Sequence, residues 1–228
     1  MNQIADRYQD AADIPAAVPV FPLDRAIVLP RRELPLNIFE PRYLAMTADA
    51  LKTEARMIGM IQPTGADDAD GLAASGRTGP EVYPTGCAGR MVSFAETGDG
   101  RYLINLAGVA RFRIREELPL LHGYRRVRPD FSEFEADLEP QPGSAIDRTR
   151  LTESLKRYFR AQKVEPNWAA IEKMEDRDLV TFLAMGCPFD ASEKQALLEA
   201  EGAAERCHVL LALLDMAGGG ERGEGTRH

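Results

Sequence analysis

Three arginines at alternate positions, Arg111, Arg113 and Arg115, have the spacing in this sequence that most directly suggests binding chemistry. Side chains two residues apart in a strand point to the same face, so the three guanidinium groups would form one basic ladder. Such a ladder could bind phosphate or RNA. The alternative is a solvated sheet face on which nearby carboxylates balance the arginines. Those carboxylates are Glu116, Glu117, Asp130 and Glu133.

A second polar pair, Glu40 and Arg42, stands where an apolar run gives way to a helical pattern. These two side chains could bind a ligand. The alternative is local: they would cap the helix and pair with the backbone or with each other, as is typical of helix starts. With the three arginines of the ladder they make up the candidate binding surface of the sequence.

The sequence lacks the standard motifs of phosphate-binding loops, zinc proteases and serine hydrolases. None of the patterns GxxxxGK[ST], HExxH and GxSxG occurs, and no lysine follows a serine at the SxxK spacing. His122 precedes Gly123 at a predicted turn, but a catalytic role there would need a partner that the sequence does not reveal. His208 follows Cys207 on a predicted helix, and adjacent helical residues point about 100° apart, so the two would not bind one metal together. The sequence therefore predicts a protein that is not an enzyme, with no catalytic residue, no cofactor and no metal.

The composition is that of a globular protein with an acidic balance. Of 228 residues, 44% are hydrophobic and 28% are charged, and the formal net charge is -8 at pH 7. The net charge argues against nucleic acid and anionic lipid as partners, because an acidic chain is not attracted to them over long range. No apolar run approaches the roughly 20 residues that cross a bilayer, and residues 1–13 lack the apolar core of a signal peptide. Three widely spaced cysteines, expected to be reduced and buried, complete the prediction of a cytoplasmic protein.

The elements that must position these side chains change character once along the chain. Residues 15–135 read mostly as strands and form the first predicted domain. Apolar runs within residues 18–29 and 34–39 are broken by prolines, which predicts edge strands or strand ends. Residues 40–55 repeat their apolar side chains at helical spacing, and residues 56–62 return to a strand pattern.

The clearest strand signal lies in residues 86–131. Apolar and polar side chains alternate on both sides of Asp99 and Gly100, a pair that tolerates the positive φ of a hairpin turn. Consecutive antiparallel strands with one apolar face imply a closed or nearly closed small barrel, or a sandwich. Residues 63–80 lack a periodic pattern and are predicted to be a loop, either functional or disordered.

Residues 136–216 read as a bundle of short helices, the second predicted domain. Asp190 and Glu193 have the spacing of a capping box at the start of one helix. Both ends of the chain, residues 1–14 and 217–228, are predicted to be disordered. Apolar side chains recur at helical spacing and are expected to form the core of the bundle. Two of these stripes are Leu151, Leu155, Tyr158 and Phe159, and Leu179, Phe182 and Leu183.

Four segments are specific enough in combination to compare with known families. They are PVFPLDRAIVLPRRELPLNIFEPRYLAM (residues 19–46), VYPTGCAGRMVSF (82–94), DGRYLINLAGVARFRIREE (99–117) and NWAAIEKMEDRDLVTFLAMGCPFDASEKQALLEA (167–200). The first three resemble the N-terminal domain of the Lon protease family, and the fourth is similar to the pattern of stand-alone Lon-domain proteins from bacteria. Together they cover most of residues 17–215. Arg31 and Arg32 stand at a turn where the family often has glycine.

The resemblance implies an α+β fold: a PUA-like small β-barrel with one inserted helix, followed by a C-terminal helical bundle. In full-length Lon this region helps to recognise substrate polypeptides and to assemble the enzyme, and the ATPase and peptidase modules follow it. This chain ends before either module, so neither an ATP site nor a peptidase dyad is carried over to its residues.

The resemblance leads to two functional hypotheses. The first is a non-catalytic module that binds unfolded or extended polypeptides, as an adaptor or chaperone-like factor in protein quality control. Such a module would bind by strand addition or apolar contact. The alternative is an RNA-binding PUA-like protein that uses the arginine ladder, a hypothesis that the net charge opposes.

Overall fold

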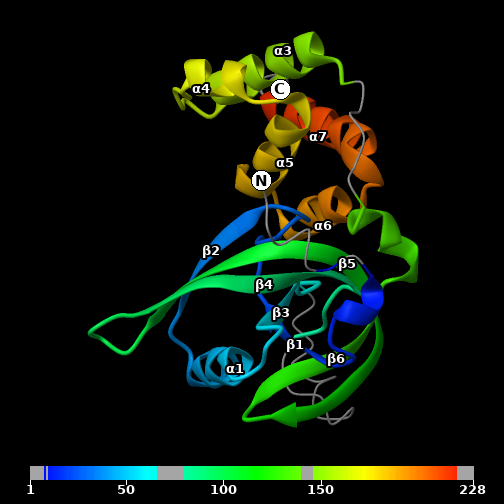
Figure 1. The fold of residues 1–228 in the computed structure, drawn as a ribbon. Coiled ribbons are helices and arrows are strands. Elements are labelled where there is room, and N and C mark those ends of the chain that lie inside the picture. Colours follow the sequence, from blue (N-terminus) through cyan, green and yellow to red (C-terminus); the bar gives the residue numbers. More distant parts are fainter. Residues whose placement is uncertain (1–7, 9, 66–79, 140–145, 220–228) are drawn as a thin grey trace, which may run out of the picture. The chain divides into compact units, whose positions relative to one another are not determined.

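The structure of the chain is a computed structural model (Figure 1). The residues that it describes are 8, 10–65, 80–139 and 146–219. Most of the predicted loop at residues 63–80 lies outside these ranges, as do residues 220–228 of the predicted tail.

The chain divides into two compact units, which we describe separately. The first unit consists of Met1–Gln141 and Phe189–Gln195. The second consists of Pro142–Pro188 and Ala196–His228. The sequence did not predict that a short segment from the helical part would belong to the first unit.

A six-stranded sheet forms most of the first unit. The sheet order is β2-β5-β4-β3-β1-β6, and β5 pairs with β6 as well. The pairings therefore run in a closed circuit through β5, β4, β3, β1 and β6, and β2 pairs with β5 alone. β1 and β3 are parallel, and the other pairs are antiparallel. The strands are β1 (Val18–Pro22), β2 (Glu33–Ile38), β3 (Met57–Ile61), β4 (Thr85–Glu96), β5 (Tyr102–Leu121) and β6 (Tyr124–Asp130).

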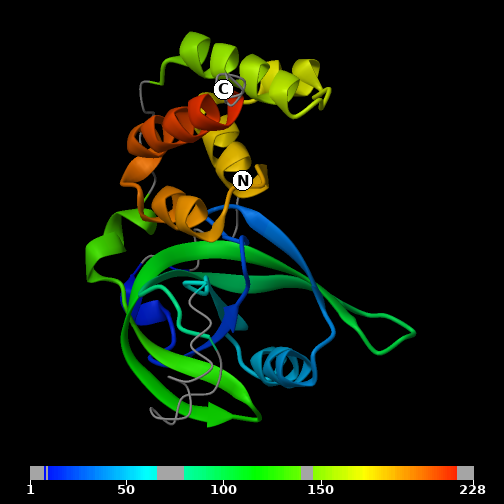
Figure 2. The same cartoon turned by 180° about the vertical axis from the view of Figure 1, so that it is seen from behind.

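The circuit closes because β5 is 20 residues long and bends. It pairs with β4 as far as Arg113 and with β6 from Arg113 onward. Register shifts interrupt both ladders, between Ala88 and Gly89 and between Ile114 and Glu116. Bulges of this kind bend and twist a strand, and Figure 2 shows the resulting curvature from behind.

Proline placement agrees with the prediction of edge strands or strand ends at Pro35 of β2 and at Pro22 of β1, but not at Pro19. β2 carries Pro35 and is an edge strand, as expected. β1 lies between β3 and β6 and so is not an edge strand, but Pro22 is its last residue, as the alternative of a strand end predicts, whereas Pro19 is its second residue. The ladder tolerates these prolines because β1 is only five residues long and Pro22 ends it.

The segment between β1 and β2 is buried without being a strand. Ile27, Val28 and Leu29 are at most 2% exposed, yet they lie outside the named strands. Arg31 has φ 66°, in the left-handed region that glycine favours, so the turn keeps a glycine-like conformation with an arginine in it. The backbone N–H of Arg31 donates to the Gly108 carbonyl at 2.8 Å, which holds this segment against β5.

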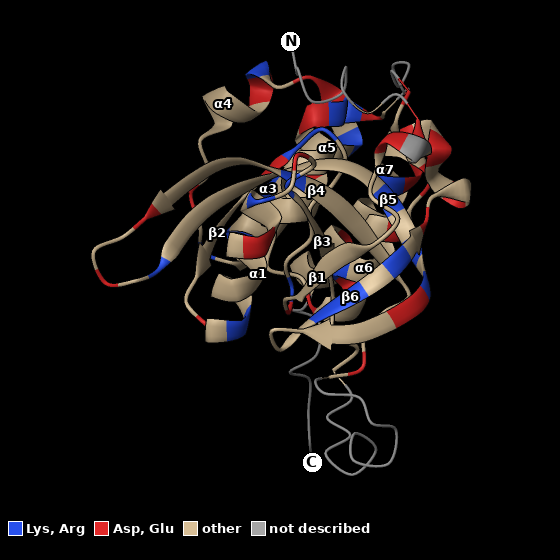
Figure 3. Cartoon of the chain, turned by 60° about the horizontal axis from the view of Figure 1, so that its bottom comes forward, with Lys and Arg blue, Asp and Glu red and all other residues tan. Residues whose placement is uncertain are grey.

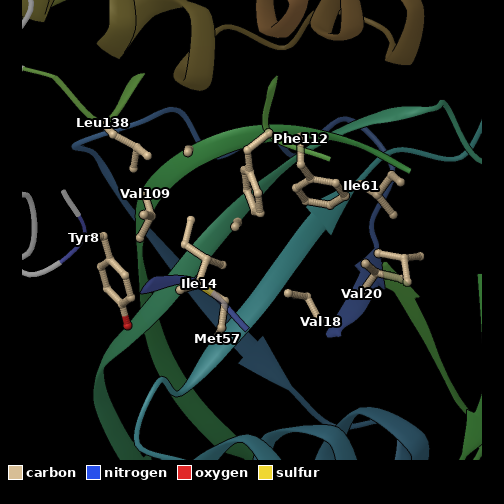
Figure 4. Packing of buried hydrophobic residues seen from close by; sticks show 13 residues of the cluster. Tyr8, Ile14, Val18, Val20, Met57, Ile61, Val109, Phe112 and Leu138 are labelled. Carbon is tan, nitrogen blue, oxygen red and sulfur yellow. The ribbon is translucent and has the colours of Figure 1, made fainter. Parts of the chain in front are cut away.

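The N-terminal residues that the structure describes are part of the core, contrary to the prediction of disorder for residues 1–14. Tyr8 is 3% exposed and Ile14 is 5% exposed, and both belong to the buried apolar cluster that also contains Val18 and Phe112 (Figure 4). The Tyr8 hydroxyl donates to the Ala55 carbonyl at 3.2 Å. Residues 1–7 and 9 lie outside the described residues.

In the described part of residues 1–141, one helix and two short 3-10 turns accompany the sheet. The helix is α1 (Pro41–Leu51), which confirms the helical pattern of residues 40–55. The 3-10 turns are η1 (Ala11–Asp13) and η2 (Ser132–Asp137). The mixed sheet with helices confirms the α+β class.

Short helices make up the second unit, in agreement with the helical spacing. In it α7 packs against both α3 and α5 through leucines that are almost fully buried. Within the described ranges no helix is long and apolar enough to cross a membrane. The helices are α3 (Arg148–Ala161), α4 (Trp168–Lys173), α5 (Asp176–Gly186), α6 (Ala191–Glu199) and α7 (Gly202–Gly218). The end of α7 shows that the tail predicted to begin at residue 217 is helical as far as Gly218.

The helix α6 begins in the first unit. The predicted capping box is confirmed: the Glu193 N–H donates to the Asp190 carboxylate at 2.9 Å, and the Asp190 N–H donates to the Glu193 carboxylate at 2.9 Å. Gln62 at the end of β3 donates to the Ala191 carbonyl at 3.0 Å. Gln195 donates to the carbonyl of a β4 residue at 3.1 Å. These bonds explain why Phe189–Gln195 belongs with the sheet.

Candidate functional site

The arginine ladder is broken at its first residue, because Arg111 is only 5% exposed. Its Nε and Nη2 donate to the Asp137 carboxylate at 2.8 and 2.9 Å, and its backbone N–H donates to the same group at 3.0 Å. The guanidinium carbon of Arg111 lies 4.7 Å from the ring centroid of Phe134. Arg111 therefore contributes to the packing of η2 on β5, and its prediction as a surface binding residue is not supported by its position.

The remaining arginines of this region stand among carboxylates (Figure 3). Arg115 is exposed. Arg113 forms an ion pair with a residue of η2, and Arg125 and Arg128 form ion pairs across the sheet. This arrangement matches the alternative of a charge-balanced sheet face and does not support RNA binding by the ladder. The ion pairs are Arg113–Glu133 at 2.8 Å, Arg125–Glu117 at 2.6 Å and Arg128–Glu116 at 2.9 Å.

Glu40 and Arg42 pair with each other at the start of α1. Nε and Nη2 of Arg42 donate to one Glu40 carboxylate oxygen at 3.0 and 2.8 Å. Glu40 is the N-cap residue, but its side chain makes no capping hydrogen bond, so that part of the local alternative is wrong. The Arg42 guanidinium also lies 4.6 Å from the ring centroid of Tyr43. Both charges are thus engaged locally at the helix start.

His122 has the partner that the sequence did not reveal. His122 and Gly123 both have positive φ, 49° and 84°, as in the two-residue turns that join antiparallel strands. This turn brings Nδ1 of His122 to 2.7 Å from the Asp49 carboxylate on α1. The same carboxylate accepts hydrogen bonds from Tyr124 at 3.1 Å and from Lys52 at 2.8 Å.

The hydrogen bonds of Asp49 with Lys52, His122 and Tyr124, here called the Asp49 cluster, hold the β5–β6 turn against α1. Hydrogen bonds from Lys52 and His122 lower the pKa of Asp49 to about 2, so the carboxylate is charged at neutral pH. Burial, followed by the hydrogen bond to Asp49, raises the pKa of Tyr124 to about 12, so its hydroxyl stays protonated. Among the residues that the structure describes, no group of three His, Cys, Asp or Glu side chains could hold a metal ion.

The pH dependence of folding should report this cluster. The folded-state pKa of Asp49 lies below its ordinary value of 3.8, so its stabilising contribution is present above about pH 4 and is lost as the pH falls toward about 2. We expect Asp49→Asn to lower the free energy of unfolding by about 1 kcal/mol near neutral pH. In urea denaturation, this difference from the unchanged protein should shrink between about pH 4 and pH 2. Asp24→Asn, at an exposed pair with Arg25, is the control. A difference that does not change with pH would contradict the assignment.

An apolar cavity of about 440 Å³ lies within the second unit. Side chains from α3, α4, α5 and the segments that connect them line it. Two of these side chains, Phe182 and Val164, are 53% and 52% exposed, so the cavity opens to solvent through apolar groups. Further lining residues are Phe159, Pro166, Ile171, Met174, Leu183 and Cys187.

A helix-terminating turn builds one wall of this cavity. Lys163 has φ 54°, and its N–H donates to the Arg160 carbonyl at 3.1 Å. The Val164 N–H reaches back to the Phe159 carbonyl at 3.0 Å. This pair of bonds is a Schellman motif, in which the residue after the left-handed position packs on the last turn of the helix. The motif therefore accounts for the presence of both Val164 and Phe159 in the cavity wall.

Aromatic rings support this wall. Phe159 packs edge-on against Trp168, with ring centroids 6.1 Å apart and an interplanar angle of 88°. Trp168 begins α4, whose N-cap is Asn167, with a side chain that accepts from the Ala170 N–H at 3.1 Å. Trp168 is the only tryptophan of the chain, so its fluorescence should report events at the cavity.

The helical spacing pointed to these cavity residues but assigned them to the core. Leu179 and Leu183 are buried as expected, whereas Phe182 of the same stripe is exposed. Cys207 is buried and His208 is exposed, as predicted. Burial raises the pKa of the Cys207 thiol, so it is not a reactive thiolate.

A second groove lies on the first unit, over β2, β4 and β5. Its volume is about 430 Å³, and Phe94 and Leu103, at 40% and 46% exposed, are among its lining residues. Phe94 packs against Tyr102 with ring centroids 5.0 Å apart. This groove is a second exposed apolar surface, in addition to the cavity of the second unit.

The match to a protein family agrees with these features. The model of the ATP-dependent protease La (LON) substrate-binding domain matches residues 17–216. The chain belongs to this family. The resemblance drawn from its sequence segments is therefore confirmed.

Among curated proteins, bacterial Lon proteases match most of the chain. Lon protease 2 of Myxococcus xanthus is 28% identical over 210 residues, which are 89% of this chain and 24% of that protein. Lon protease of Anaeromyxobacter dehalogenans is also 28% identical over 210 residues, which are 89% of this chain and 23% of that protein. The chain thus spans about a quarter of the length of these relatives.

Solved structures of the same domain share the fold. The Lon N-terminal domain protein from Xanthomonas campestris matches with a TM-score of 0.57 and 20% identity, over 87% of this chain and 98% of that one. The N-terminal domain of the Mycobacterium avium complex Lon protease matches with a TM-score of 0.58 and 17% identity, over the same shares of the two chains. Neither these matches nor the ion-paired arginines support the RNA-binding alternative.

Proposed function

We propose that this chain is a polypeptide-binding module and that the cavity of its second unit receives apolar side chains of its partners. The observation that carries the proposal is an apolar, solvent-open cavity in a member of a substrate-binding domain family. Its volume of about 440 Å³ lies within the range of roughly 300–1,000 Å³ that is usual for ligand sites. Burying one large apolar side chain there would contribute about 1.5–3 kcal/mol.

The family supports three finer parts of the proposal. Partners would be unfolded or extended polypeptides, because only such chains offer apolar side chains that a folded protein buries. An adaptor or chaperone-like role in protein quality control, in the cytoplasm, is consistent with that class of partner. A PUA-like barrel in the first unit is supported by the closed circuit of strand pairings.

The proposal is tested by peptide binding, read out from Trp168 fluorescence and from the anisotropy of a labelled peptide. The peptide is an extended, uncharged sequence with one Phe or Leu anchor. We expect Phe182→Ala to weaken binding by about 1–2 kcal/mol, roughly five- to thirtyfold in Kd, because it removes an exposed ring from the cavity mouth. The same change should leave the free energy of unfolding within about 0.5 kcal/mol, since Phe182 is half exposed.

The matched control is Phe94→Ala, which removes a similarly exposed ring from the groove of the first unit. We expect it to leave peptide affinity unchanged. A loss confined to Phe94→Ala would move the site to the sheet. Absence of any peptide binding, with self-association that Phe182→Ala abolishes in sedimentation, would replace the proposal with a homodimer interface.

A further inference from the structure

A stripe of positive charge runs along α3 beside the cavity. Lys156, Arg160 and Lys163 follow one another at spacings of four and three residues, so they share one face of the helix and its C-terminal turn. All three are exposed. They lie next to the Phe159 side of α3, and Lys156 places its ammonium 5.9 Å from the ring centroid of Trp168.

Arg160 and Lys163, the last two residues of this stripe, have no acidic residue within the helical turn before them. The segment 154–164 contains no acidic residue. In the described part of the chain, Arg160 and Lys163 make no ion pair, whereas Arg157 on another face of α3 pairs with Asp215 at 2.6 Å. Glu153, three residues before Lys156, is the nearest acid on α3 itself, and Glu165 and Glu172 belong to the following loop and to α4.

The charge of the stripe is opposite in sign to the net charge of the whole protein. The formal net charge is -8, so an acidic partner is repelled over long range. Screening limits that repulsion to about 10 Å at 0.1 M salt, whereas a contact with the stripe acts at shorter distance. An acidic group beside the cavity would therefore meet net attraction.

We propose that the cavity selects apolar side chains that have acidic residues beside them in the partner polypeptide. The apolar side chain enters between Phe159 and Phe182, and the flanking carboxylates pair with Arg160 and Lys163. This inference rests on the proposed function, because it assigns a partner class to the same cavity. Exposed ion pairs contribute about 0.2–1 kcal/mol each, so two of them should favour an acidic flank by about two- to thirtyfold in Kd.

Three peptides with one apolar anchor and flanks of Asp, Asn or Lys test the selection. Trp168 fluorescence and peptide anisotropy, at about 0.1 M salt, give the three Kd values. We expect the Asp peptide to bind most tightly and the Lys peptide most weakly. Arg160→Glu should abolish the preference, because the new carboxylate offsets the attraction of Lys163 for the acidic flank. Lys163→Gly should reduce the preference without loss of fold, because glycine suits the positive φ of that residue.

Arg150→Glu is the matched control. It makes the same charge change on the same helix, ten residues or about 15 Å before Arg160, and it places an acid in the first turn, where the helix dipole favours one. We expect it to leave the order of the three peptides unchanged. Circular dichroism of each variant verifies the helical content.

The outcomes separate the two proposals. If the three peptides bind equally well, or if Arg160→Glu leaves their order intact, the charge selection is overturned while polypeptide binding stands. If none of the three peptides binds, the proposed function fails and the selection fails with it. A preference for the Asp peptide that Arg150→Glu abolishes would also overturn the assignment to the cavity.

Discussion

Asp137→Asn should lower the free energy of unfolding by about 3–5 kcal/mol, which is the usual cost of removing one charge of a buried ion pair. Asp137 and Arg111 are 7% and 5% exposed, and the carboxylate accepts three hydrogen bonds from Arg111. An amide in its place cannot accept from all of these donors, and it leaves the guanidinium buried without its counter-charge. Urea denaturation at neutral pH measures the loss.

A neighbouring ion pair provides the control for this prediction. Arg113 and Glu133 lie on the same two elements, β5 and η2, but their side chains are 42% and 56% exposed. Glu133→Gln should therefore change the free energy of unfolding by less than about 1 kcal/mol. Equal losses for the two variants would show that burial of Asp137 does not govern the effect.

A double variant distinguishes a lost interaction from a stranded charge. Replacing Arg111 with Met and Asp137 with Asn removes both charges, keeps similar volumes and leaves an amide oxygen that can accept from the buried backbone N–H at position 111. Because no charge is then buried without its partner, the double variant should recover part of the stability lost in Asp137→Asn. A double variant less stable than Asp137→Asn would contradict this account.

The arginine ladder illustrates what alternation in the sequence can and cannot predict. Alternation correctly places Arg111 and Arg113 on strand β5. It cannot indicate which part of a strand face another segment covers, and here η2 covers Arg111 while Arg113 stays accessible. Asp137 of the covering segment comes 26 residues after Arg111, and that segment has no regular period that would indicate its path.

Local signals predicted the elements well because their causes are local. The capping box at Asp190, the turn before Arg101 and the helix after Glu40 each depend on residues within a few positions of one another. The assignment of Phe189–Gln195 to the sheet depends on Gln62, more than 120 residues earlier, and so could not be read from spacing.

The cavity was missed for a related physical reason. Helical spacing identifies an apolar stripe, and a stripe is usually buried. Phe182 lies on such a stripe but is exposed. The left-handed turn at Lys163 leads the chain into α4, and α4 leaves an open cavity beside Phe182. A lysine in the left-handed conformation carries little sequence signal, since glycine is the residue that usually marks it.

Gly108→Ala should destabilise the first unit by about 3 kcal/mol or more, within the range of severe core substitutions. A Cβ at this position would lie 2.1 Å from the Leu29 carbonyl oxygen and 2.7 Å from its carbon. Both are backbone atoms, so no rotamer change relieves the overlap. The hydrogen bond from the Gly108 N–H to the Arg32 carbonyl, at 2.8 Å, would have to lengthen as the two segments separate.

The control for this prediction is Gly98→Ala in the β4–β5 turn. No atom lies within 4 Å of a Cβ built there, and Gly98 is not among the glycines with positive φ. We therefore expect a change within about 0.5 kcal/mol in the same urea denaturation experiment. Near-equal stabilities for the two variants would mean that the segment from Leu29 to Arg32 does not lie against β5. A large loss for Gly108→Ala alone would instead show that close backbone contact, rather than strand pairing, fixes this non-strand segment in the core.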